Sequence, residues 1–357
     1  MLIKESSGPP GKKFLIPGKY LIVMAVIVLY IILDSVQIDY SLYDFSALYK
    51  LNLFFWGIFI QAFPFILSGA LLSSSIQIFF NREKFDALAG SSGKASLLFP
   101  LIASFILPVC DCSSVTVAAG FVKKNLPLRS VIIYLLAAPI VNPIVIAATI
   151  FAFPGKTEMV IIRIAIGLLT AFIVALIMHR IFGGPNASYI RQSNHEHKIC
   201  GCEHCAAEIK IALNMPLISK LRMLLLNTGD ELFHVLPYII AGSLISSMFQ
   251  LWIPKSIIQS NSAFAGIFLQ TGIMLSAAFL LSLCSTSDSF VARSFYGHFT
   301  AGPVLGFMIL GPMIDVKNVI VLSSYFKKRF VAILTLLIFF TVYLLIILLS
   351  FLFKGLL

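Results

Sequence analysis

The chain has 357 residues, of which 59% are hydrophobic and 11% are charged, and its formal net charge is +11. Soluble domains are roughly 45–50% apolar and about 25% charged, so this composition excludes a soluble globular protein and indicates a polytopic membrane protein. The positive charge does not indicate nucleic-acid binding, because Lys and Arg lie in short loops between apolar segments rather than in a separate basic domain.

Nine apolar segments are long enough to cross or enter a bilayer, since a span needs about 20 residues. They cover 14–33, 52–80, 97–122, 130–153, 159–182, 224–253, 263–296, 300–323 and 330–353. The first has no small-residue cleavage site before Asp34, so we expect an uncleaved helix and not a signal peptide. The pattern predicts an all-α protein with an N-terminal tail and helix (1–50), a first membrane repeat (51–182), a cytoplasmic loop (183–222) and a second membrane repeat (223–357).

The two membrane halves resemble each other at an offset of 173 residues. FPFILSGALLSSS at 63–75 aligns with LPYIIAGSLISSM at 236–248, and six of the thirteen positions are identical. At the same offset, LLAAPIVNP at 135–143 aligns with MILGPMIDV at 308–316. Both segments contain a proline that interrupts the helix, so each half is expected to contain a broken helix at this point.

With one residue of slippage, the motif Cys-Asp-Cys-Ser-Ser at 110–114 corresponds to Cys-Ser-Thr-Ser-Asp at 284–288, and Asn142 corresponds to Asp315. Paired broken segments of this kind form the substrate sites of many transporters near the middle of the membrane. The repeat therefore predicts that the two motifs lie together, with Cys110 close to Cys284.

The distribution of Lys and Arg predicts how the segments are oriented, because cytoplasmic loops are enriched in them. If every segment crosses fully, the two sides hold 13 and 12 of these residues, with Lys317 left inside its span. If 97–122 and 263–296 instead dip in and return on the same side, the cytoplasmic side holds 19 and the outer side 6. We therefore expect two re-entrant hairpins, three full crossings per half, an inverted second half, and a cytoplasmic N-terminus and 183–222 loop.

Asp111 lies between two thiols in an apolar run, where an ionisable side chain costs at least about 2.5 kcal/mol and so needs a partner or a function. Thiolates bind soft ions or electrophilic metalloids, and a neighbouring carboxylate can accept the proton that a thiol releases. Small polar residues that only allow close helix packing would explain the serines but not Asp111. The predicted substrate-binding residues are Cys110, Asp111, Cys112, Ser113, Asn142, Cys284, Ser287, Asp288 and Asp315.

His234 and Gln61 occupy the same repeat position, each three residues before a proline. Histidine can relay protons near neutral pH, so His234 together with Asp111 is a candidate for proton coupling. A hydrogen bond from the histidine to a neighbouring helix explains the residue equally well.

The 183–222 loop contains six Cys and His side chains within eleven residues, more than the four ligands that zinc or copper(I) prefers. They are His195, His197, Cys200, Cys202, His204 and Cys205. Their order matches no zinc-finger spacing, so the expectation is a site for zinc or copper(I), and a flexible linker is the alternative.

At PVCDCSSVTVAAGFVKKNLPL…AAPIVNPIVI, and again at LSLCSTSDSFVARSF…LGPMIDVKN, the chain resembles the bacterial predicted-permease family built on domain of unknown function 318. That family includes permeases assigned to the efflux of organic arsenicals. The resemblance covers the chain from about residue 50 to 350 and implies a multi-pass permease of the bacterial inner membrane.

These observations lead to one main hypothesis and two alternatives. The main hypothesis is a secondary efflux transporter, not an enzyme, for a small soft metal ion or a thiol-reactive metalloid compound. The first alternative is a membrane redox protein in which a strained and reducible Cys-x-Cys disulfide cycles. The second is a non-transporting subunit that works with another membrane subunit.

Overall fold

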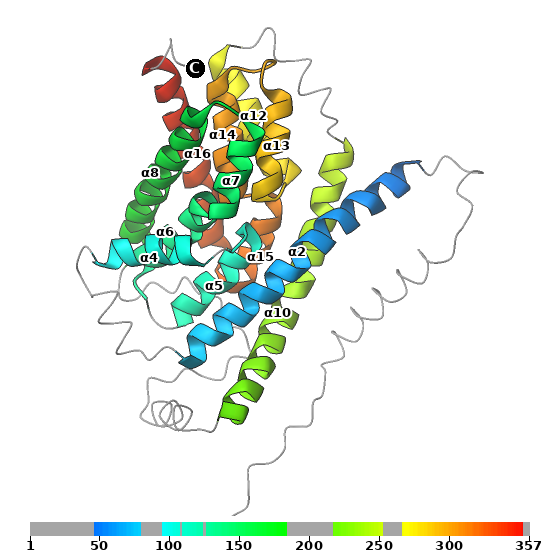
Figure 1. Ribbon diagram of the computed structural model, residues 1–357, viewed down its shortest axis with the longest axis vertical. Coiled ribbons are helices and arrows are strands. Elements are labelled where there is room, and N and C mark those ends of the chain that lie inside the picture. The colour runs from blue at the N-terminus through cyan, green and yellow to red at the C-terminus, as the bar shows by residue number, and fades with distance from the viewer. Residues whose placement is uncertain are drawn as a thin grey trace, which may run out of the picture. The chain divides into compact units, whose positions relative to one another are not determined.

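The computed structural model describes residues 46–79, 95–107, 109–123, 126–183, 217–252 and 266–352 (Figure 1). Within these ranges the chain is helical and forms no strand, apart from one isolated bridge between Tyr296 and Phe299. The helices are α2 (Ser46–Phe79), α4 (Ala95–Ile106), α5 (Asp111–Lys123), α6 (Leu128–Val141), α7 (Pro143–Ala152), α8 (Thr157–Phe182), α10 (Leu217–Trp252), α12 (Ile267–Leu281), α13 (Ser285–Phe295), α14 (Ala301–Met313), α15 (Val316–Tyr325) and α16 (Lys328–Leu352). The prediction of an all-α fold is confirmed.

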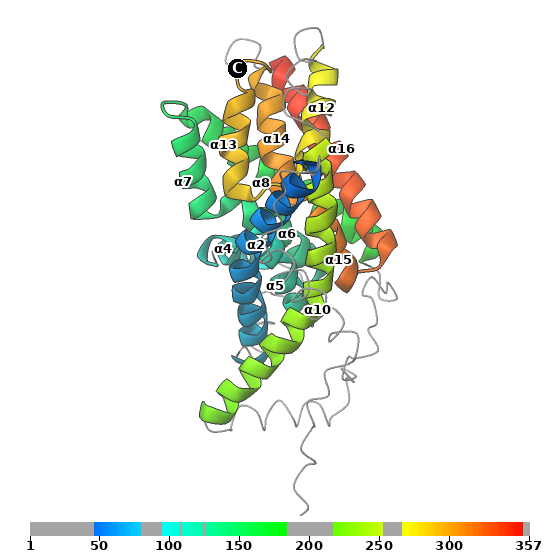
Figure 2. The same cartoon turned by 90° about the vertical axis from the view of Figure 1, so that its right-hand side faces the viewer.

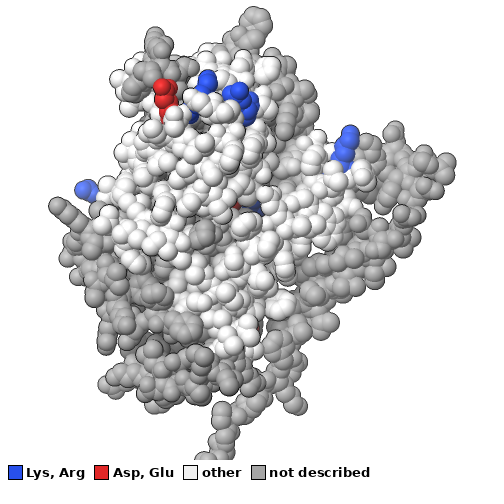
Figure 3. Space-filling model, viewed as in Figure 1, with Lys and Arg blue, Asp and Glu red and all other residues white. Residues whose placement is uncertain are grey.

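Six stretches of the described chain are long and apolar enough to cross a membrane. They are Tyr49–Ile76, Leu128–Ala152, Thr157–Phe182, Met223–Leu251, Ala301–Tyr325 and Lys328–Leu352. Their outer faces expose large apolar side chains, such as Phe151 at 77% and Leu336 at 69%. Figure 3 shows few charged side chains on the described part of one face. The chain is therefore a multi-pass membrane protein, as expected. The first predicted segment, 14–33, lies outside the described residues.

The two segments expected to be re-entrant are each divided into two short helices. The helices α4, α5, α12 and α13 have 12, 13, 15 and 11 residues. At about 1.5 Å per residue none of them crosses the roughly 30 Å hydrocarbon core alone. The breaks fall at 107–110 and 282–284, where the two polar motifs begin. Such lengths are those that a re-entrant hairpin needs, and the return of each hairpin to its own side stays a prediction.

The order of elements is the same in the two halves. Each begins with a long helix that contains a proline, Pro64 in α2 and Pro237 in α10. Each continues with a divided pair (α4–α5 or α12–α13), a second divided pair (α6–α7 or α14–α15) and a final long helix (α8 or α16). The inverted orientation of the halves and the predicted domain boundaries stay predictions.

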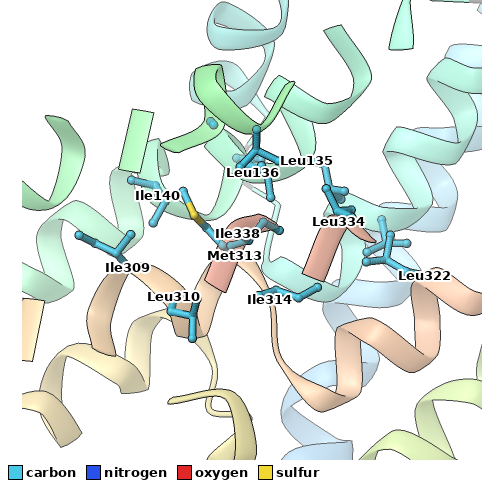
Figure 4. Packing of buried hydrophobic residues seen from close by; sticks show 14 of the residues in the cluster. Leu135, Leu136, Ile140, Ile309, Leu310, Met313, Ile314, Leu322, Leu334 and Ile338 are labelled. Carbon is cyan, nitrogen blue, oxygen red and sulfur yellow. The ribbon is translucent and has the colours of Figure 1, made fainter. Parts of the chain in front are cut away.

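The core is built on α6 and α14, which lie against each other at the centre of the described helices. Every residue of α14 is buried, and so are most residues of α6. Figure 4 shows Leu136 and Ile140 of α6 near Ile309 and Met313 of α14, with Ile338 of α16 beside them. These helices are apolar all round, which is the composition expected of helices surrounded by other helices.

Four helices from the two halves form a closed ring of contacts, in which α2 packs on α5, α5 on α15, α15 on α10 and α10 on α2. Figures 1 and 2 both show α2 and α10 side by side. Two glycines at the same repeat position allow close approach within this ring. A Cβ atom on Gly69 would overlap the Ser113 side chain of α5, and one on Gly242 would lie 3.2 Å from Cα of Lys317 in α15. Small residues are typical of such helix contacts in membranes.

We expect Gly69→Leu to lower the free energy of unfolding by about 1–3 kcal/mol, because the new side chain forces α2 away from α5. The measurement is the thermal unfolding midpoint of the detergent-solubilised protein. Gly229→Leu in α10 is the matched control, since nothing lies within 4 Å of the added Cβ there. An unchanged midpoint for Gly69→Leu would contradict the close packing of α2 on α5.

Candidate functional site

A cavity of about 260 Å³ lies where the two helix breaks meet α2 and α10, and we call it the thiol cavity. Its polar lining consists of Gln61, Cys110, Asp111, Cys112, Gln250, Ser282, Cys284, Ser287 and Lys317. Apolar side chains of α2, among them Leu53 and Phe65, form much of the remaining wall. The two motifs that the repeat alignment pairs thus line one cavity, and Cys110 and Cys284 both belong to it.

The first motif forms the break before α5 and the first turn of this helix. Cys110 and Cys112 are free thiols and are buried, and their sulfur atoms lie within 4.8 Å of each other and of an Asp111 oxygen. The Ser113 hydroxyl donates a hydrogen bond to the Cys110 carbonyl at 3.1 Å and lies 3.3 Å from the Cys110 sulfur. Because the amino end of a helix carries partial positive charge, this position favours a thiolate or a carboxylate.

Lys317 is a cavity residue that the predicted substrate-binding set did not include. Its ammonium lies 3.5 Å from a carboxylate oxygen of Asp111 and 3.5 Å from one of Asp315. All three side chains are at most 3% exposed. The ammonium therefore joins α5 of the first half to α15 of the second. The sequence feature that could have identified it is its position inside an apolar span, since the count of Lys and Arg placed Lys317 on neither side of the membrane.

The second motif forms the break between α12 and α13. Ser282 adopts a left-handed conformation with φ of 47°, which ends α12 abruptly. The Gln250 side chain of α10 donates a hydrogen bond to the Leu281 carbonyl at 2.7 Å, which satisfies one of the carbonyls released there. Cys284 is half-buried, and its sulfur is 3.6 Å from the Thr286 hydroxyl. These contacts stabilise the break, so Ser282 and Cys284 line the cavity.

Asn142 and Asp315 support the cavity from outside its lining. The Asn142 amide donates to the Val109 carbonyl at 3.1 Å, and its oxygen accepts from the Ile144 backbone at 2.9 Å. It thus ties the break before α5 to the start of α7. The Asp315 carboxylate caps α15 by accepting from the Asn318 backbone at 2.6 Å. Both side chains hold chain breaks in place, and a direct part in substrate binding stays a prediction.

Two other predicted residues lie away from the lining. Asp288 is fully buried on α13 beyond the cavity wall. His234 on α10 lies edge-on to the Tyr325 ring, with ring centroids 5.2 Å apart, and the Tyr325 hydroxyl donates to Glu231 at 2.7 Å. The repeat mate of the histidine, Gln61, does line the cavity. The part of His234 in proton coupling stays a prediction, and the Cys/His-rich loop at 183–222 lies almost entirely outside the described residues.

Comparison with known proteins identifies the family. A family described as "Predicted permease" matches residues 47–354. The chain belongs to this predicted permease family. The permease is 31% identical over 292 residues to "UPF0718 protein YcgR" of Bacillus subtilis (strain 168), covering 81% of this chain and 93% of the relative. No solved structure matches.

A second relative has a name that refers to an assembly. The permease is 32% identical over 280 residues to the "Putative two-component membrane permease complex subunit" of Streptococcus mutans serotype c (strain ATCC 700610 / UA159). The match covers 78% of this chain and 87% of that protein. Both relatives therefore align with most of the membrane region that holds the thiol cavity.

We expect Lys317→Met to destabilise the permease by about 3–5 kcal/mol, because it leaves the Asp111 and Asp315 carboxylates buried without their cation. The thermal unfolding midpoint measures the effect. The double variant Asp111→Asn/Lys317→Met should recover part of the loss. Lys328→Met, at an exposed position of α16, is the matched control and should unfold at the wild-type temperature. A wild-type midpoint for Lys317→Met would contradict the ion bridge.

Proposed function

We propose that this permease is a secondary efflux transporter for a soft metal ion or a thiol-reactive metalloid compound, bound in the thiol cavity. The observation that carries the proposal is the gathering of three free thiols, Cys110, Cys112 and Cys284, from two distant helix breaks around one cavity. Soft thiolate ligands select soft ions and electrophilic metalloids. The substrate would be held by sulfur from both halves at once.

The ammonium of Lys317 affects which species the thiol cavity can bind. Binding to a thiol releases its proton, and the Lys317 ammonium, which lines the same cavity, stabilises the thiolate that remains. Lys317 also opposes the entry of a hard divalent cation, which has no compensating affinity for sulfur. The site therefore favours species that bond to sulfur over species that need only carboxylates.

Alternation between two sides is supported by the symmetry of the contacts. The contact of α5 with α15 corresponds, after exchange of the halves, to the contact of α13 with α7, and both contacts are present. The α4–α6 contact has a counterpart in α12–α14, and α6–α8 has one in α14–α16. We therefore propose that the halves are an inverted repeat with the substrate site between them, as in other secondary transporters.

The loop at 183–222 is proposed to bind zinc or copper(I) through its six Cys and His side chains and to deliver or sense metal at the cytoplasmic surface. Four N or S ligands complete such a site, and the loop supplies more than that number. This site is separate in the sequence from the thiols of the cavity.

We expect Cys110→Ser and Cys284→Ser each to reduce transport at least about tenfold, on the scale known for partners in metal sites. The measurement is resistance of a strain that lacks other exporters to zinc, copper, cadmium, arsenite and methylated arsenicals. It is paired with uptake of the same compound by inside-out vesicles. Unfolding midpoints of the variants near that of the wild type would show that folding is intact. Unchanged resistance and uptake in both variants would refute the thiol site.

A second candidate is a permease that requires another membrane subunit, and the name of the Streptococcus mutans relative favours it. In that case the chain expressed alone should give no uptake in vesicles, and co-expression of the second membrane subunit should restore it. The affinity-tagged chain should then retain that subunit during purification in mild detergent. Full uptake by vesicles that contain this chain alone would rule the candidate out.

A further inference from the structure

A second buried polar cluster lies between the halves, away from the lining of the thiol cavity. It consists of Thr149 of α7, Arg163 of α8, and Asp288 and Ser289 of α13, and none of these side chains is more than 1% exposed. One guanidinium nitrogen of Arg163 donates to the Thr149 hydroxyl at 2.5 Å and to the Ser289 hydroxyl at 2.8 Å. These contacts hold the guanidinium at the junction of α7, α8 and α13.

The charged groups of this cluster have unused hydrogen-bonding capacity. Among the described residues, neither carboxylate oxygen of Asp288 has a hydrogen-bond partner, and neither do Nε and the second terminal nitrogen of Arg163. No ion pair within 4.0 Å joins the two side chains in the described part of the chain. A buried carboxylate without a partner is unstable as an anion, so it requires a positive ligand.

The surroundings of Asp288 supply no such ligand within contact distance. Its helix packs on α7 and α14, whose sequences contain no ionisable side chain. Its carboxylate faces Gly311 of α14, where an added Cβ would lie 2.5 Å from one of the oxygens. The charged groups that act on it from a distance are Arg163, Asp111, Asp315 and Lys317. The last three already form their own ion bridge.

The cluster lies at the helix contact that the repeat relates to the ion bridge of Lys317. The contact of α13 with α7 is the counterpart of the contact of α5 with α15, where Lys317 bridges Asp111 and Asp315. Asp288 follows Cys284 by one helical turn and is adjacent to Ser287, and both of these residues line the thiol cavity. A change at the carboxylate can therefore reach the cavity through a single turn of α13.

We propose that Asp288 binds the monovalent cation, a proton or a sodium ion, whose gradient drives transport, and that Arg163 is the positioning residue of this site. This inference rests on the proposed function. A bound cation neutralises the carboxylate while the guanidinium stays on Thr149 and Ser289. When the cation leaves, the free donors of Arg163 are available to the carboxylate. A nearby fixed positive charge also keeps cation binding weak enough for release on the other side.

The first experiment needs no transported substrate. The purified full-length chain in detergent is heated at several pH values between 5 and 9, and in NaCl against choline chloride. A cation that binds the folded state stabilises it by mass action, so the wild-type midpoint should rise with proton or sodium concentration. In Asp288→Asn this rise should fall to half or less. The control Glu158→Gln, at an exposed position of α8, should behave as the wild type.

Gly311→Ala provides a second variant in case Asp288→Asn folds poorly, because its methyl group takes the space beside the carboxylate. In this variant, the cation concentration needed to raise the unfolding midpoint should be at least tenfold higher than in the wild type. A dependence on pH identifies the proton, and a dependence on sodium at constant pH identifies sodium. The proposal is overturned if the wild type depends on neither cation, or if Asp288→Asn and Gly311→Ala both keep the full dependence.

The second experiment measures coupling with cadmium and arsenite as probes in proteoliposomes. An imposed proton or sodium gradient should accelerate wild-type uptake at least about fivefold, and Asp288→Asn should lose this acceleration while still exchanging probe across the membrane. If the wild type carries neither probe, the proposed substrate fails, and the cation site is still decided by the unfolding measurements. Acceleration of Asp288→Asn equal to that of the wild type would overturn the coupling site.

Discussion

The structure depends on the pairing of oppositely charged side chains that are buried among the helices. Lys317 lies between Asp111 and Asp315, so one ammonium is shared by two buried carboxylates. The bridge also fixes geometry, because its carboxylates belong to α5 of one half and to the start of α15 of the other. Buried ion pairs are weak sources of net stability but strong determinants of which groups can be neighbours. Here the pairing places the thiols of the first half beside the cavity wall made by the second.

The divided helices make such an arrangement possible. Each break releases backbone groups that lipid cannot satisfy, so each is closed by a particular side chain. Asn142 bonds to the Val109 carbonyl, Gln250 bonds to the Leu281 carbonyl, and Asp315 caps α15. The polar residues that interrupt the apolar segments therefore have two distinct duties. Some line the cavity, and others form hydrogen bonds at the helix breaks that surround it.

Much of the architecture could be predicted because lipid imposes simple rules on length and polarity. The apolar segments from 52–80 onward coincide with the helices, and the aligned motifs place Cys110 and Cys284 on one cavity. The alignment could not separate lining residues from supporting ones, since Asn142 and Cys110 both appear as polar positions at a break. It also did not identify the partner of Asp111. That partner is Lys317, about 200 residues away, and only the packing of α5 on α15 brings the two together.

The ring of α2, α5, α15 and α10 has a further consequence. In this arrangement α2 and α10 close around the α5–α15 pair, whereas the equivalent α13–α7 pair packs only on α6, α8 and α14 among the larger contacts and lies at the edge of the described helices (Figure 2). If the halves are an inverted repeat, as we propose, exchange of the halves gives a second arrangement of similar energy, with α2 and α10 closed around α13 and α7. Gly69 and Gly242 lie at the contacts of α2 with α5 and of α10 with α15, and because they have no side chain they would allow these helices to move past each other during the exchange. Under the proposed transport function, one sequence would then specify both end states, and the arrangement described above would correspond to one of them.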